Sequence, residues 1–213
     1  DVCSSDLGRG YDRPMPARTL YPRFAARRLA EACADSPAVL IHGPRQSGKT
    51  TLARLAGKRA RYAYFTFDDQ TTLDAASSDP VGFVAGLPRR AILDEVQHVP
   101  ELFRSLKAAI DRERVPGRFI LTGSTNVLLL PRLADSLAGR LAVLRLHPLA
   151  QCELARRRSD FLDRLFGGGF PVKRWRRPGA GLAERIARGG FPAALALPAG
   201  RRRAAWYASY IET

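Results

Sequence analysis

The chain has 213 residues, enough for one α/β domain and the start of a second region. Its cysteines, Cys3, Cys33 and Cys152, have no Cys or His partner at the spacing of a metal site. No apolar run approaches the about 20 residues of a membrane span, and Asp1 to Gly10 does not resemble a signal peptide, so we expect a cytoplasmic protein without a membrane partner. The net charge of +15 suggests nucleic acid, but Arg outnumbers Lys 31 to 4, as GC-rich genomes also produce.

The first predicted elements are a helix and a strand that leads through a glycine-rich loop into another helix. Residues 1–19 are expected to be unstructured or non-native. Tyr21 to Ala34 has the pattern of a short amphipathic helix that ends before a proline. Ala38 to His42 is a short β-branched apolar run, and Thr50 to Arg59 has a helical pattern.

The following elements continue the alternation of strands and helices. A helix is predicted from Pro100 to Arg114. Four further strands are predicted at Tyr62 to Phe67, Ala91 to Leu93, Phe119 to Leu121 and Leu141 to Leu146. This alternation predicts a three-layer α/β fold whose mainly parallel five-stranded sheet is covered by helices on both faces.

The last third of the chain differs from the rest in composition. Residues 20–150 are predicted as the core, 151–181 as a basic Gly/Pro-rich connection, and 182–213 as a helical lid with the start of a truncated C-terminal domain. Residues 140–213 carry 15 basic and 5 acidic side chains, which supports a nucleic-acid partner there. Because the chain has no initiating Met and stops inside a predicted helix, we expect a fragment of a longer reading frame.

The glycine-rich loop matches G-x-x-x-x-G-K-[ST], with a predicted strand before it and a helix after it. Glycine permits the tight path that turns backbone N–H groups toward phosphates, Lys49 reaches the β- and γ-phosphates, and the Thr50 hydroxyl ligates Mg²⁺. ATP and Mg²⁺ are therefore the expected ligands. The predicted ATP-binding residues are Gly43, Pro44, Arg45, Gln46, Ser47, Gly48, Lys49, Thr50 and Thr51.

Two carboxylates follow the third predicted strand, where the carboxyl ends of parallel strands border a phosphate site. Asp94 is predicted as the Mg²⁺ residue, and Glu95 as the base that polarises the attacking water. The next strand ends in a polar cluster, Thr122 to Asn126. A hydroxyl or amide group of this cluster could help to position that water, or the cluster could simply form a turn.

These motifs occur in an order that resembles an AAA-superfamily group of bacterial and archaeal ATP-binding proteins with a C-terminal domain of unknown function. The resemblance covers residues 20–213 and depends on the ordered set. The matching stretches are Gly43 to Gln46 leading into Gly48 to Leu52, Leu93 to Gln97, Leu121 to Ser124, Leu137 to Arg140, Pro148-Leu149 with Glu153, and Gly189 to Pro192.

The resemblance implies a P-loop NTPase fold, ATP hydrolysis with Lys49 and Glu95 as catalytic residues, and further roles for two residues. It places Ser124 at the sensor position and Arg140 at an arginine-finger position. Arg140 reaches the carboxyl-end rim of the sheet only if the helix predicted at Leu133 to Leu137 runs back across the sheet. On that path it points toward the phosphate loop of a neighbouring subunit, which predicts a homo-oligomer. The alternative is a solvated arginine at the end of that helix, where the helix dipole favours a positive charge.

Two alternative functions stay open at this stage. A small-molecule P-loop kinase would use a substrate-binding carboxylate near the second strand, such as Asp68 or Asp69. A nucleotide-gated binding module with negligible turnover would differ only in that Glu95 does not act as a base. A GTPase would need an Asn-Lys-x-Asp motif, which the sequence lacks. An ABC ATPase would need its signature segment between the phosphate loop and Asp94, and nothing there resembles it. The process that ATP turnover drives is not specified by any of these motifs.

Overall fold

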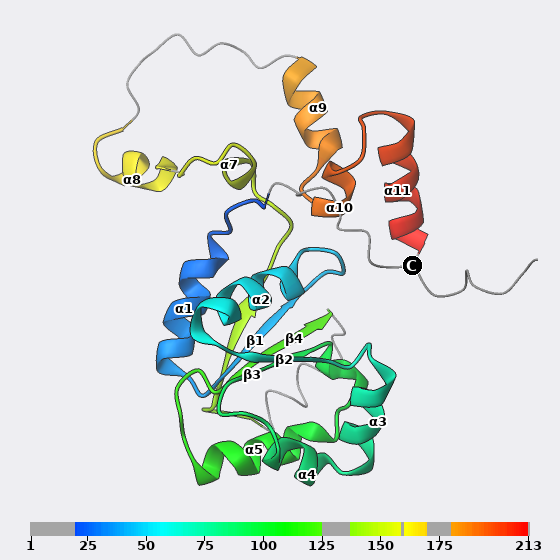
Figure 1. Cartoon of the computed structure of the whole chain (residues 1–213). Coiled ribbons are helices and arrows are strands. Elements are labelled where there is room, and N and C mark those ends of the chain that lie inside the picture. The colour runs from blue at the N-terminus through cyan, green and yellow to red at the C-terminus, as the bar shows by residue number, and fades with distance from the viewer. Residues whose placement is uncertain (1–19, 125–136, 159, 170–179, 213) are drawn as a thin grey trace, which may run out of the picture.

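The computed structural model describes residues 20–124, 137–158, 160–169 and 180–212 (Figure 1). A five-stranded sheet with the order β2-β3-β4-β1-β5 forms the centre of the fold, and all its strand pairs are parallel. The strands are β1 (Ala38–Gly43), β2 (Ala63–Thr66), β3 (Ala91–Asp94), β4 (Phe119–Ser124) and β5 (Leu141–Arg145). The sequence-based prediction of a parallel five-stranded sheet is confirmed.

Helices cover both faces of this sheet because its central strands are apolar on both sides. Val39 and Ile41 of β1 pack with Leu29 of α1 (Ala25–Asp35) and Leu52 of α2 (Lys49–Ala60). The alternate residues face α3 (Gln70–Ser78), α4 (Pro80–Ala85) and α5 (Leu102–Arg112). Successive residues of a strand point to opposite faces, so a fully apolar strand requires a layer of helices on each side. The predicted three-layer arrangement is confirmed.

Helices α3 and α4 were not predicted from the sequence, although both carry clear start signals. The Asp69 carboxylate accepts a hydrogen bond from the backbone N–H of Thr72 at 2.9 Å, and Asp79 accepts one from Gly82 at 2.8 Å. Pro80 follows Asp79 at the first position of α4. An acidic N-cap followed by Pro is a recognised helix start, so this signal was available in the sequence.

The sheet register brings the ends of three strands together. Gly43 of β1 lies beside Ser124 of β4, and Leu93 of β3 lies beside Leu121 of β4. The loop after β1, the residues after β3 and the end of β4 therefore share the carboxyl-terminal edge of the sheet.

Short helices follow the sheet in the last third of the chain. They are α7 (Gln151–Leu154), α8 (Phe161–Phe166), α9 (Ala180–Arg188), α10 (Pro192–Leu195) and α11 (Arg201–Glu212). The expected connection over residues 151–181 thus contains helical turns. Figure 1 shows α10 and α11 beyond the edge of the sheet that carries the phosphate loop, and Tyr210 of α11 donates a hydrogen bond to the Arg45 carbonyl at 3.2 Å. Among the helices of the described residues, none has both the length and the apolar character that crossing a membrane requires.

Candidate nucleotide and metal site

The loop between β1 and α2 has a backbone path that depends on its two glycines. A Cβ on Gly43 would lie 2.2 Å from the carbonyl oxygen of Leu146. Gly48, the N-cap of α2, has a φ of 95°, in the left-handed region that side chains other than glycine rarely adopt. The loop therefore delivers the N-terminus of α2, with its free N–H groups, to the edge of the sheet.

Lys49 lies against this loop. Its Nζ donates to the carbonyls of Gly43 and Pro44, each at 3.2 Å, and the residue is only 4% exposed. Burial lowers the pKa of the Lys49 ammonium, and the Glu95 and Asp94 carboxylates act in the opposite direction. The buried Ser47 Oγ has no hydrogen-bond partner among the described residues. A buried polar atom without a partner is costly, so the loop is suited to a ligand that supplies polar atoms.

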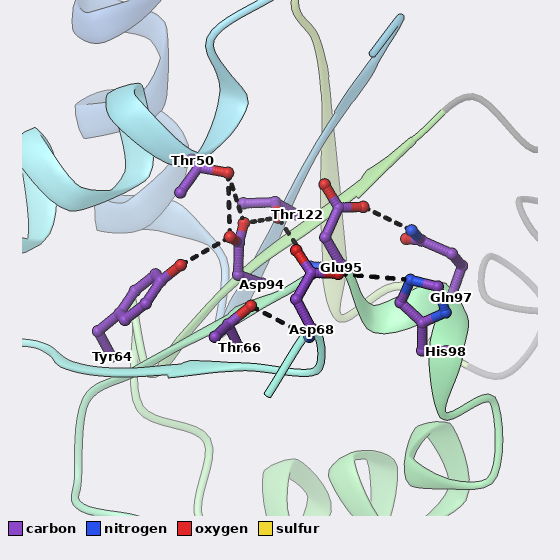
Figure 2. A network of polar contacts seen from close by, with 9 residues as sticks. All are labelled: Thr50, Tyr64, Thr66, Asp68, Asp94, Glu95, Gln97, His98 and Thr122. Carbon is purple, nitrogen blue, oxygen red and sulfur yellow. Dashed lines mark hydrogen bonds and ion pairs between the residues drawn. The ribbon is translucent and has the colours of Figure 1, made fainter. Parts of the chain in front are cut away.

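The Asp94 carboxylate is surrounded by three hydroxyl groups from three different elements (Figure 2). Thr50 Oγ1 lies 3.0 Å from each Asp94 carboxylate oxygen. Tyr64 Oη on β2 donates to Asp94 Oδ2 at 2.7 Å, and Thr122 Oγ1 on β4 donates to Asp94 Oδ1. The side chain is buried at 3% exposure, so these hydroxyls replace the water that would otherwise solvate it.

Glu95 directly follows Asp94 but takes a separate path. Its φ of 58° and ψ of 47° place it in the left-handed region, where β3 ends and the 3₁₀ turn η1 (Val96–His98) begins. Its backbone N–H donates to Thr122 Oγ1 at 3.1 Å, and its Oε2 accepts a hydrogen bond from Gln97 Nε2. Such a conformation is rare for a residue other than glycine and is often found at functional sites.

The two remaining predicted residues lie at opposite ends of the sheet. Ser124 is half-buried at the end of β4, in register with Gly43 and thus beside the phosphate loop. Arg140 immediately precedes β5 and its carbonyl accepts from Ala38, so it lies at the amino-terminal edge of the sheet. Arg140 therefore does not lie at the carboxyl-end rim of the sheet, where the arginine-finger prediction would place its guanidinium.

Arg140 is held at that edge by its own chain. Its guanidinium pairs with Asp111 of α5 and donates to the Ala138 carbonyl at 2.9 Å. The structure does not bring Arg140 to the phosphate loop of its own chain, and a role across a subunit interface stays a prediction. Most of the helix expected at Leu133 to Leu137 lies outside the described residues.

The site also contains residues that no sequence motif indicated. Arg23 Nη1 donates to the Ser47 carbonyl at 2.9 Å, and its Nε lies 3.3 Å from Glu153 Oε1. Burial lowers the pKa of Arg23, while Glu153 opposes that shift. Neither Arg23 nor Tyr64 belongs to a local motif. Both meet the site through contacts between residues that are distant in sequence.

A divalent metal at this site would have few protein ligands. Within residues 20–124, 137–158, 160–169 and 180–212, no three His, Cys, Asp or Glu side chains are grouped as a metal centre. Asp94 and Thr50 offer one carboxylate and one hydroxyl. Mg²⁺ is commonly bound by one or two carboxylates together with phosphate oxygens, so this oxygen donor set fits Mg²⁺ held jointly with a nucleotide.

Residues 35–155 match the sequence profile of the family described as the AAA domain. The chain belongs to this family. The AAA domain match includes the phosphate loop, Asp94-Glu95 and all five strands, so the chain is an AAA-superfamily member with a P-loop ATPase fold. The further resemblance to proteins with a C-terminal domain of unknown function stays a prediction.

Relatives of this AAA domain are found in mycobacteria. Uncharacterized proteins of Mycobacterium tuberculosis and Mycobacterium bovis are each 35% identical to this chain over 192 residues, which are 90% of this chain but 38% of those proteins. A Walker-type ATPase of Pyrococcus abyssi has a similar structure, with a TM-score of 0.50 and 16% identity over 83% of this chain and 65% of that one. At this identity the likeness concerns the fold alone.

Proposed function

We propose that this AAA domain binds ATP with Mg²⁺ and hydrolyses it. The observation that carries the proposal is the meeting of the Thr50 hydroxyl and the Asp94 carboxylate, 3.0 Å apart, beside a buried lysine and the N-terminus of α2. This arrangement combines an anion site with an oxygen-rich cation site, which is what a metal-bound triphosphate requires.

In this proposal the loop residues bind and orient the phosphates. The free N–H groups at the start of α2 donate to phosphate oxygens, and the Lys49 ammonium exchanges its carbonyl partners for the β- and γ-phosphates. Thr50 and Asp94 would hold Mg²⁺. When bound, that ion would neutralise charge on the phosphate oxygens and thereby assist the departure of ADP from the γ-phosphorus.

Glu95 is proposed as the base for the attacking water. The water oxygen forms a bond to the γ-phosphorus, the bond from that phosphorus to the bridging oxygen breaks, and the water proton passes to the Glu95 carboxylate. ADP and inorganic phosphate are the products. Gln97 holds one Glu95 oxygen, and we assign it the role of orienting this base.

A small-molecule kinase could use only one of the two carboxylates after β2 freely, because the other is already engaged. The Asp69 carboxylate is used as the N-cap of α3, where it also accepts a hydrogen bond from the Thr72 hydroxyl at 2.8 Å. Asp68 is exposed, and His98 Nε2 lies 3.7 Å from its Oδ1. A binding module without turnover would use the same loop residues and differs only at Glu95.

The test compares Glu95→Gln and Lys49→Ala with the wild-type protein. We expect Glu95→Gln to bind ATP normally but to release phosphate at least about 100-fold more slowly, because a general base contributes ~10²–10⁴ to the rate. Lys49→Ala should lose ATP binding itself. Steady-state phosphate release and calorimetric ATP titration give the two measurements. Phosphate release by Glu95→Gln at the wild-type rate would show that Glu95 is not the base.

We further propose nucleic acid as the partner to which turnover is coupled. The support is the uneven charge of the chain, since residues 140–213 contain 15 of its 35 basic side chains and only 5 of its 20 acidic ones. Several of these arginines are exposed, namely Arg157, Arg158, Arg185, Arg201 and Arg202. Exposed guanidinium groups with few acidic neighbours attract phosphate backbones.

A further inference from the structure

The phenol of Tyr64 makes a contact that plays no part in the chemistry proposed above. Tyr64 comes from β2, which is an edge strand of the sheet, and its Oη donates to Asp94 Oδ2 at 2.7 Å. Figure 2 shows the Tyr64 ring reaching Asp94 on the side away from Gln97. The phenol therefore touches the carboxylate proposed to hold the metal, but not the carboxylate proposed as the base.

The ring of Tyr64 is half-buried and packs against the edge of the apolar core. It lines an open groove of about 530 Å³ between α2 and β2, together with Arg54, Tyr62 and Ile92. The Arg54 guanidinium lies over the ring, 4.8 Å from its centroid. Because phenylalanine would keep the ring and this cation contact, removal of the hydroxyl alone leaves no cavity in the core.

We propose that Tyr64 is a positioning residue for metal-dependent nucleotide binding, acting through its hydrogen bond to Asp94. This inference rests on the proposed function, in which Asp94 and Thr50 hold Mg²⁺. It extends the site beyond the motif residues to a side chain on a separate strand, 30 positions before Asp94.

The physical reason lies in the limited number of groups that orient the Asp94 carboxylate. Thr122 Oγ1 donates to Oδ1, Tyr64 donates to Oδ2, and Thr50 approaches both oxygens. Thr50 is itself a proposed metal ligand, so Thr122 and Tyr64 remain as the groups that hold the two oxygens during metal binding. Removal of the phenol would leave Oδ2 without its own donor and allow the carboxylate to rotate. Losing such an outer hydrogen bond typically weakens metal affinity about 10- to 100-fold.

The experiment measures ADP binding to Tyr64→Phe by calorimetry, with saturating Mg²⁺ and with EDTA. We expect the ADP affinity in EDTA to equal that of the wild-type protein, because the phosphate loop is intact. The Mg²⁺ concentration that gives half of the metal-dependent gain in affinity should rise about tenfold or more. Electron paramagnetic resonance of Mn²⁺ in the presence of ADP reads the same metal site without any turnover.

Tyr62→Phe is the matched control because Tyr62 lies two residues earlier in the chain and lines the same groove. Its hydroxyl donates to the Gly117 carbonyl and does not contact Asp94. We expect its Mg²⁺ dependence to stay at the wild-type value. An unchanged Mg²⁺ dependence in Tyr64→Phe, or an equal change in Tyr62→Phe, would overturn the inference. If Mg²⁺ does not alter ADP or ATP binding by the wild-type protein, the proposed metal site itself is wrong.

Discussion

Asp94 and Glu95 are adjacent in sequence but are held by different sets of residues. Asp94 belongs to the end of β3 and is bound by hydroxyls of α2, β2 and β4. Glu95 has left-handed backbone angles, and its carboxylate is bound by Gln97 of the following 3₁₀ turn. The two carboxylates therefore have separate hydrogen-bond donors. In the proposed function, the Asp94 carboxylate serves a metal and the Glu95 carboxylate serves a water molecule.

Gln97 provides a test of this arrangement at the level of one side chain. Gln97→Met keeps the length of the side chain and removes the donor to Glu95. We expect kcat for ATP hydrolysis to fall about 10- to 100-fold with little change in KM, because a misplaced base lowers the rate without affecting phosphate binding. Steady-state kinetics measure the two values, and thermal unfolding checks that the variant is folded. A rise in KM with an unchanged kcat would contradict this role.

The elements around the phosphate loop are connected by one buried ion pair. Arg23, which lies just before α1, donates to the Ser47 carbonyl in the loop and to the His147 carbonyl after β5. Glu153 of α7 pairs with Arg23 and accepts hydrogen bonds from the backbone N–H groups of Phe24 and Ala150, at 2.7 and 2.9 Å. The two side chains are 11% and 6% exposed. Together they join the start of α1, the phosphate loop and the segment after the sheet.

Glu153→Ala should destabilise the protein strongly, because it leaves the Arg23 charge buried without its partner. Breaking a buried ion pair in this way typically costs about 3–5 kcal/mol of unfolding free energy. Urea denaturation monitored by circular dichroism gives the value. Glu113→Ala is the control, because Glu113 is 60% exposed and lies 3.9 Å from Arg118, so its removal should cost at most about 1 kcal/mol. Equal and small losses of stability in both variants would refute the proposed contribution of the buried pair.

Across the whole molecule, acidic and basic residues are distributed unevenly between the sheet region and the segment that follows it. Residues 1–139 carry 20 basic and 15 acidic side chains, whereas residues 140–213 carry 15 and 5. The helix α11 in this basic segment lies close to the candidate nucleotide site, since its Tyr210 donates to the Arg45 carbonyl. A polyanion bound by this segment would thus lie near the proposed site of ATP turnover.

We expect double-stranded DNA to bind with an affinity that falls steeply as the salt concentration rises. Replacing Arg157 and Arg158 by Glu should weaken binding and reduce the slope of log affinity against log salt by about one for each DNA phosphate that is no longer neutralised. Fluorescence anisotropy at several salt concentrations measures this slope. Replacement of the exposed Arg59 and Arg61 by Glu makes the same charge change outside the basic segment and should have a smaller effect. Absence of DNA binding at low salt would leave genome composition as the explanation for the charge.

The local parts of this protein follow from its sequence without any further information. Residues 43–50 identified the phosphate loop because the tight turn, the lysine and the hydroxyl lie within one short segment. The apolar runs identified all five strands, and those of the central strands β1, β3 and β4 are clearest because these strands are buried on both faces. The point where the apolar run of β3 stops also located Asp94 and Glu95.

Which distant residues meet these local parts depends on the tertiary structure. The parallel register places Tyr64 and Thr122 on either side of Asp94, whereas no spacing rule relates residues on separate strands of one sheet. It also places Arg140 before β5 at the amino-terminal edge, away from the phosphate loop of its own chain. Local motifs depend on a few consecutive backbone angles, but contacts between elements depend on the order and direction of all the strands. The strand order β2-β3-β4-β1-β5 was therefore determined by the tertiary structure and not by the sequence motifs.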